Sequence, residues 1–175
     1  MLVGVSINND NMETVTSVTY NGIPLTYVDS ETQADDARVE IWKLVNPPVG
    51  TGDLVVTFSA NLKRQAAAGV ITFTGVDQSN PLRTFVGDNA TSNSASVSVP
   101  SAAGELILGV FSCETCDSVT FSGQSVQHWN LMLGGGREFG AGATWQGAGN
   151  QVTLSAALGK RDHWALGGIS IRPAQ

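Results

Sequence analysis

An acidic stretch in the first quarter of the chain offers a candidate set of metal ligands. Four carboxylates lie within residues 29–36, at Asp29, Glu31, Asp35 and Asp36. Carboxylate oxygens on a loop are hard ligands of the kind that Ca²⁺ prefers. The ligand order of an EF-hand is absent, and a solvated turn gives the same pattern. A weak calcium site and a plain surface turn therefore both stay open.

The two cysteines form a Cys-x-x-Cys motif at Cys113 and Cys116. Zinc would require a second such motif or two suitably spaced histidines, whereas His128 and His163 stand alone in the sequence. A thioredoxin-like motif would open a helix, and no helical pattern follows this one. We therefore favour a structural role, as free thiols or a local disulfide, over metal or redox chemistry.

Catalytic patterns are weak. Glu40, Glu105 and Glu138 lie on or beside expected strands, and glycoside hydrolysis needs two carboxylates that face each other across a cleft. Exposed strand carboxylates also serve simply for solubility, and the sequence does not give their separation. The Gly-x-Ser-x-Gly elbow of hydrolases is absent, and the glycine runs 134–136 and 140–142 lack the context of a phosphate loop. We expect no catalytic residue, no cofactor and no enzyme.

Four tryptophans stand out in a chain that has few aromatic residues. Trp42 shares a strand face with Arg38 and Glu40, and Trp129 follows a histidine. A flat, exposed indole on a β-sandwich stacks well on the apolar face of a sugar ring. Trp42 and Trp129 are therefore the carbohydrate-stacking candidates, and packing in the core is the alternative for both.

Composition excludes several classes of protein. Charged residues make up 14% of the 175 residues, and the net charge is −6 with only three lysines. Nucleic-acid binders usually carry a basic field, so we expect no nucleic-acid partner. No run of about 18 apolar residues occurs, so we expect no insertion into a membrane.

The elements that must position these residues are short strands. Alternating polar and apolar runs recur between turn signals, and no long helical period is seen. Asn21-Gly22 predicts a type I′ hairpin turn, and 46–52 contains two prolines that cannot continue a ladder. Only 61–68 is ambiguous between one helical turn, a loop and the start of a strand. We expect strands over 2–8, 14–20, 23–28, 38–45, 53–59, 68–74, 94–99, 105–112, 118–121, 124–133, 138–145, 151–156 and 163–171.

The burial pattern of these strands predicts one all-β domain over 1–175. The runs 106–108 and 70–71 are apolar on both faces, which is typical of central strands covered on both sides. The run 96–99 alternates strictly, which suits a sheet with one wet face. About a dozen short strands without helices favour an antiparallel two-sheet β-sandwich of jelly-roll-like type.

Four segments taken together resemble a known kind of domain. They read VTYNGIPL at 18–25, VEIWKLVNPP at 39–48, FTGVDQ at 73–78 and WALGGISIRP at 164–173. In this order they are similar to an uncharacterised β-sandwich domain of large secreted bacterial proteins and phage-type structural proteins. The resemblance covers nearly the whole chain and transfers no catalytic residues. It implies a module for scaffolding or adhesion in a virion, outside the cell or on its surface.

One departure from that resemblance concerns the first strand. Members of the family usually have a further strand-length segment before the Leu-Val-Gly-Val strand, which here begins at Leu2. A vacancy beside the first strand would expose unpaired backbone groups and invite a strand from another chain. Alternatively, the numbering begins inside a longer natural chain.

These observations favour a non-enzymatic structural subunit. Capsid decoration, a spike or tail component and a cell-surface appendage are the expected settings, with assembly from copies of itself or with a capsid, tail or appendage protein. The alternative is a carbohydrate-binding adhesion module that recognises glycans through its tryptophans. A glycoside hydrolase is the least favoured interpretation.

Overall fold

The protein folds into strands connected by loops. The computed structural model describes residues 1–10, 12–34 and 36–174, and these contain no helix. The all-β class is therefore confirmed. The strands are β1 (Leu2–Asn8), β2 (Val15–Tyr20), β3 (Ile23–Pro24), β4 (Thr26–Gln33), β5 (Ala37–Lys43), β6 (Leu54–Phe58), β7 (Ala66–Ile71), β8 (Val86–Pro100), β9 (Leu106–Cys113), β10 (Val119–Phe121), β11 (Ser125–Leu133), β12 (Glu138–Gln146) and β13 (Gln151–Ile171).

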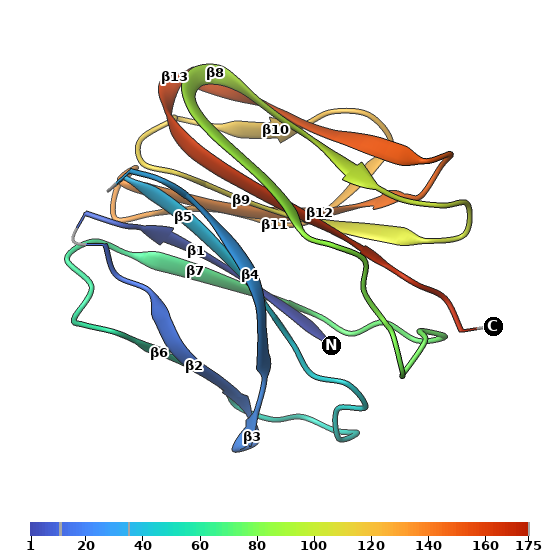
Figure 1. Ribbon diagram of the computed structural model, residues 1–175. Coiled ribbons are helices and arrows are strands. Elements are labelled where there is room, and N and C mark those ends of the chain that lie inside the picture. Colours follow the sequence, from blue (N-terminus) through green and yellow to red (C-terminus); the bar gives the residue numbers. More distant parts are fainter. Residues whose placement is uncertain (11, 35, 175) are drawn as a thin grey trace.

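Three sheets pack against each other (Figure 1). We name them the N-terminal sheet (β4-β5-β1-β7), the C-terminal sheet (β10-β13-β9-β12-β11, with β8 on β13) and the small sheet (β3-β2-β6). Every strand pair within them is antiparallel. The expected antiparallel sandwich is present, with one sheet more than the two we predicted.

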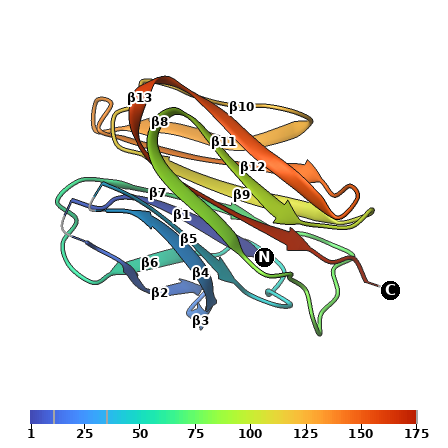
Figure 2. The ribbon, with the colours of Figure 1, turned by 45° about the horizontal axis from the view of Figure 1, so that its top comes forward.

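A long hairpin of β8 and β13 adds a further layer. The two strands bend together, and their pairing shifts register between Ala157 and Asp162 (Figures 1 and 2). The bend turns Ala95, Val97 and Leu154 onto the outer face of the C-terminal sheet. Sequence analysis missed the first half of β8 and divided β13 in two, because exposed polar residues at the bend resemble a loop.

Three apolar cores lie between these layers. One fills the space between the small sheet and the N-terminal sheet, and one fills the space between the N-terminal and C-terminal sheets. The last lies under the bent hairpin. Strands β1, β9 and β12 have cores on both faces, which explains why they are buried along almost their whole length.

The predicted central strand at 106–108 is confirmed, but the same prediction for 70–71 is wrong. These two residues end β7, which is the edge of the N-terminal sheet, and Val70 is 42% exposed. The alternation at 96–99 is confirmed, because Val97 and Val99 are buried and the serines between them are exposed.

The Asn21-Gly22 turn is also confirmed. Both residues have positive φ, 51° and 75°, and Tyr20 pairs with Ile23 across the turn. Asparagine and glycine tolerate this left-handed backbone, whereas most side chains would strain it. The ambiguous segment 61–68 resolves into a loop followed by the start of β7.

The first strand has no vacant edge. β1 pairs with β5 on one side and with β7 on the other, over nearly its full length. The prediction that a foreign strand adds beside Leu2–Asn8 is therefore wrong. Sequence could not show this, because the residues that pair with β1 lie about thirty or more positions away along the chain.

Among the described residues, no helix is present that could cross a bilayer.

Candidate functional site

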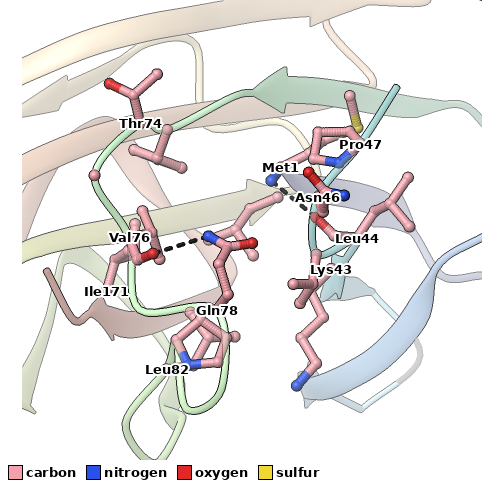
Figure 3. A pocket seen from close by; sticks show the side chains of 15 residues that line it. Met1, Lys43, Leu44, Asn46, Pro47, Thr74, Val76, Gln78, Leu82 and Ile171 are labelled. Carbon is pink, nitrogen blue, oxygen red and sulfur yellow. Dashed lines mark hydrogen bonds between the residues drawn. The ribbon is translucent and has the colours of Figure 1, made fainter. Parts of the chain in front are cut away.

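An apolar cleft opens at the end of the sandwich where β1 begins and β13 ends. It has a volume of about 310 Å³. Loops after β5 and β7 form its walls, so that Lys43 and Leu44 face Val76 and Leu82 across it (Figure 3). This volume lies at the lower end of the range of small-molecule sites.

Few polar groups surround the cleft. Gln78 Nε2 donates a hydrogen bond to the Val76 carbonyl at 2.8 Å, and the Met1 amine donates to the Leu44 carbonyl at 3.0 Å. Burial lowers the pKa of that amine. Lys43 makes no ion pair with a carboxylate of the described residues. The cleft thus combines apolar walls with an ammonium group that has no carboxylate partner.

The lining of this cleft carries no carboxylate, imidazole or thiol. The mostly apolar lining suits binding of an apolar group.

Trp42 is part of the core and not an exposed platform. Its side chain lies between the small sheet and the N-terminal sheet, and the residue is 7% exposed. The indole Nε1 donates to Glu40 Oε2 at 3.0 Å, and the Arg38 Nε donates to Glu40 Oε1 at 2.7 Å. The predicted sharing of one strand face by these three residues is confirmed, but the face is buried.

Trp129 lies between the N-terminal and C-terminal sheets. It pairs with Gly142 of the neighbouring strand, and its indole packs over the positions of Gly142, Gly4 and Gly69. A Cβ atom at Gly69 or Gly142 would collide with the ring, and one at Gly4 would collide with Val110 and lie 3.2 Å from the ring. Trp129 therefore acts as an inter-sheet wedge, a partly buried indole that packs against the backbone of these glycines.

The three strand carboxylates serve different parts of the fold. Glu40 lies in the layer between the small and N-terminal sheets, where the Val15 amide and Arg38 also donate to it. The Nε–H group of Arg83 is shared by the two carboxylate oxygens of Glu105, at 2.8 Å from Oε1 and 2.7 Å from Oε2. Glu138 begins β12, at the opposite end of the β9–β12 pair from Glu105. No two of these three form a facing pair.

The acidic stretch does not form one loop. Asp29 and Glu31 belong to β4, where Asp29 accepts the Ser30 amide and Glu31 accepts from Asn89. Asp35 lies outside the described residues. Asp36 lies apart from the strand carboxylates, with its Oδ2 atom 2.8 Å from His163 Nδ1. Two of the four predicted calcium ligands thus lie on β4 and Asp36 lies in the turn before β5, so the single loop that the calcium interpretation assumed is not seen among the described residues.

Polar side chains gather at the end of the sandwich opposite the cleft. Cys113 pairs with Phe139 on one side and with Trp164 on the other, and all three face the core under the bent hairpin. Side chains alternate along a strand, so the adjacent residues Glu138, Glu114 and His163 form a row that faces the N-terminal sheet. We call these three residues the polar row.

On the side of the N-terminal sheet, the residues that lie next to the polar row are Asn8, at the end of β1, and Asp36, in the turn before β5. Asn8 Nδ2 donates to the Arg137 carbonyl at 2.6 Å, and the Asn9 amide donates to the Asp36 carbonyl at 3.1 Å. Asp36, Glu114 and His163 each offer one ligand atom, and these atoms lie within 4.8 Å of one another. The described structure thus brings together residues that lie more than forty positions apart in sequence.

Burial dominates the electrostatics of the polar row. It raises the pKa of Glu138 well above that of an ordinary carboxyl group, although a hydrogen bond from Ser112 acts in the opposite direction. Burial also raises the pKa of Glu114, with further contributions from Asp36 and Asp162. Both carboxyl groups therefore favour the protonated, uncharged form more than exposed carboxyl groups do.

The Cys-x-x-Cys segment positions Glu114. Cys113 and Cys116 form a disulfide, which resolves the alternative between free and bridged thiols. Within the bridge, the Thr115 amide and hydroxyl both donate to Asp162 Oδ2, at 2.6 and 2.8 Å. These contacts tie the loop that carries Glu114 to β13.

Sequence reasoning missed Glu114 and treated His163 as isolated. Their proximity follows from the registers of β9 with β12 and β13, which no local pattern encodes. The one available signal was that Glu114 lies between two cysteines and therefore on a constrained segment. His128 is separate from this region and contacts Thr144 Oγ1 at 2.9 Å through Nε2.

Comparison with known proteins gives no match, whether to a family model, to a curated protein or to a solved structure.

The Trp129 wedge yields a first prediction. Gly142→Ala places a methyl group against the indole, so we expect the free energy of unfolding to fall by about 1–3 kcal/mol. Gln127→Ala, at an exposed position of β11, the strand that carries Trp129, should change it by less than about 0.5 kcal/mol. Urea denaturation followed by tryptophan fluorescence measures both. Equal stability of the two variants would contradict the wedge.

The raised pKa of Glu138 yields a second prediction. A carboxyl group whose folded pKa exceeds its unfolded pKa contributes stability below the unfolded value, and this contribution is lost as pH rises through the folded value. Glu138→Gln stays neutral, so its stability relative to the native chain should increase as the pH rises above the ordinary carboxyl pKa of about 4.3. Urea denaturation at a series of pH values from there upward tests this. A pH-independent difference between Glu138→Gln and the native chain would refute it.

Proposed function

We propose that this chain is a non-enzymatic structural subunit that assembles with further copies of itself, on a virion or on a cell-surface appendage. The observation that carries the proposal is the open edge of the C-terminal sheet at β11. This strand pairs with β12 on one side and has no strand on the other among the described residues.

The composition of β11 distinguishes it from a protected edge. Its nine residues contain no Lys, Arg, Asp or Glu, whereas the β4 edge carries Asp29 and Glu31. Val126 is 61% exposed and Met132 is 59% exposed. Natural proteins usually protect edge strands with charged residues or proline, because unpaired backbone groups recruit other strands.

The occupant that fits this edge best is a second copy of β11. Two copies related by a two-fold axis would pair antiparallel and continue the C-terminal sheet across the interface. Each chain carries a net charge of −6, so copies repel each other over most of their surfaces. An edge strand without charged residues is the place where this repulsion opposes contact least.

The native oligomer and a matched pair of lysine variants test this function. Native mass spectrometry and light scattering should show a dimer or larger assembly of the native chain, which Val126→Lys reduces to monomers. Val49→Lys makes the same exchange at a fully exposed residue of the loop 46–52, away from β11, and should leave the assembly intact. A monomeric native chain, or equal effects of the two variants, would reject assembly through β11.

The cleft supports a second candidate function, which is binding of an amphiphilic anion. Its apolar walls fit a short hydrocarbon chain, and the Lys43 ammonium fits a carboxylate head group. A medium-chain fatty acid combines these two features, so decanoate is a suitable probe and decanol its uncharged counterpart.

Calorimetry with these two probes tests the cleft. We expect Lys43→Gln to weaken decanoate binding by about fivefold, the effect of losing one exposed ion pair, and to leave decanol binding unchanged. Lys160→Gln, which alters an exposed lysine paired with Asp117, should change neither. Absence of decanoate binding, or equal loss for both probes, would exclude this function.

A further inference from the structure

We propose that Asp36, Glu114 and His163 form a binding site for a divalent transition-metal cation of the Zn²⁺ or Mn²⁺ type. This site is independent of the β11 edge and of the cleft. Its three residues come from the turn before β5, from the loop after β9 and from the middle of β13. The fold therefore builds the site from distant parts of the chain.

The distances suit a shared ion. One ligand atom from each residue lies within 4.8 Å of the other two. Metal–ligand bonds to nitrogen and carboxylate oxygen are about 2.0–2.2 Å long, so donor atoms on opposite sides of an ion lie about 4 Å apart. His163 Nδ1 is buried and lies 2.8 Å from Asp36 Oδ2 without regular hydrogen-bond geometry. Small side-chain rotations bring the three donors onto one ion.

Two further buried oxygen atoms belong to residues that neighbour this site. Among the described residues, Asn8 Oδ1 and Glu138 Oε2 find no hydrogen-bond partner, and both residues are fully buried. Asn8 faces the C-terminal sheet at the Arg137 carbonyl, and Glu138 lies beside Glu114 in the polar row. Buried acceptors without donors are rare in folded proteins and are commonly explained by a water or an ion.

The charges around the site also favour a cation. Asp10 forms ion pairs with Arg64 and Lys63, and Asp162 accepts a hydrogen bond from the Thr115 hydroxyl. Glu114 and Glu138 have no lysine or arginine partner among the described residues. A bound divalent ion would offset the charges that face each other there.

The donor set defines the class of metal. One imidazole with two carboxylates suits Zn²⁺ or Mn²⁺, whereas Ca²⁺ and Mg²⁺ prefer oxygen ligands alone. The surroundings hold the donors in place, because the Cys113–Cys116 bridge and Asp162 constrain the Glu114 loop and the Asn9 amide holds Asp36. Such outer contacts are what orient ligands around a metal.

Titration calorimetry on the chelator-treated full chain tests the site. We expect one Zn²⁺ or Mn²⁺ to bind per chain, and Ca²⁺ and Mg²⁺ to bind at least tenfold more weakly. His163→Gln and Glu114→Gln should each weaken binding at least tenfold. The matched controls His128→Gln and Asp29→Asn alter an imidazole and a carboxylate outside the site and should bind as the native chain does.

Proton NMR of the native chain keeps the test independent of how the variants fold. The chain has two histidines, so substoichiometric Mn²⁺ should broaden the ring signals of His163 strongly and those of His128 little. Absence of binding, equal broadening of both rings, or equal weakening by His163→Gln and His128→Gln would overturn the proposal.

Discussion

The structure depends on strands that are buried on both faces. β1, β9 and β12 each lie between two cores, so their backbone groups must be paired on both sides and their side chains must fit two packed layers at once. Between these layers there is little room for side chains. A Cβ at Gly140 would meet Ala67 and Ser6, and one at Gly109 would meet Trp145. The abundance of glycine and alanine in these strands follows from close packing of layers more than from turns.

The same burial makes each polar group inside the layers costly, and the fold treats two of its fully buried carboxylates, Glu40 and Glu138, differently. Glu40 receives hydrogen bonds from Arg38, Trp42 and the Val15 amide, which together compensate its charge. Glu138 receives one from Ser112 and keeps one oxygen without a partner. A structural role accounts for Glu40 completely. Glu138 lacks such compensation, and the polar row around it is therefore the better place to look for chemistry.

Much of the fold could be predicted because its signals are local. The Asn21-Gly22 turn, the alternation at 96–99 and the all-β class each follow from a few neighbouring residues. The position of β1 inside its sheet, the continuity of β13 and the grouping of Asp36 with Glu114 and His163 follow from register between distant strands. The tryptophans mislead for a related reason. An indole suits a sugar platform and an inter-sheet wedge equally well, and only the glycines opposite Trp129 decide between them.

β1 connects the two ends of the sandwich. Leu2 lines the cleft, and Asn8 at the other end of the strand faces the polar row. A strand advances about 3.3 Å per residue, so these two regions lie roughly 20 Å apart. Sites at such a separation respond to substitution almost independently, because they share no side-chain partner. The β11 edge runs along the side of the sandwich and not across either end. Copies joined at that edge would leave a cleft and a polar row on every subunit, so assembly and binding at the two ends are compatible within one particle.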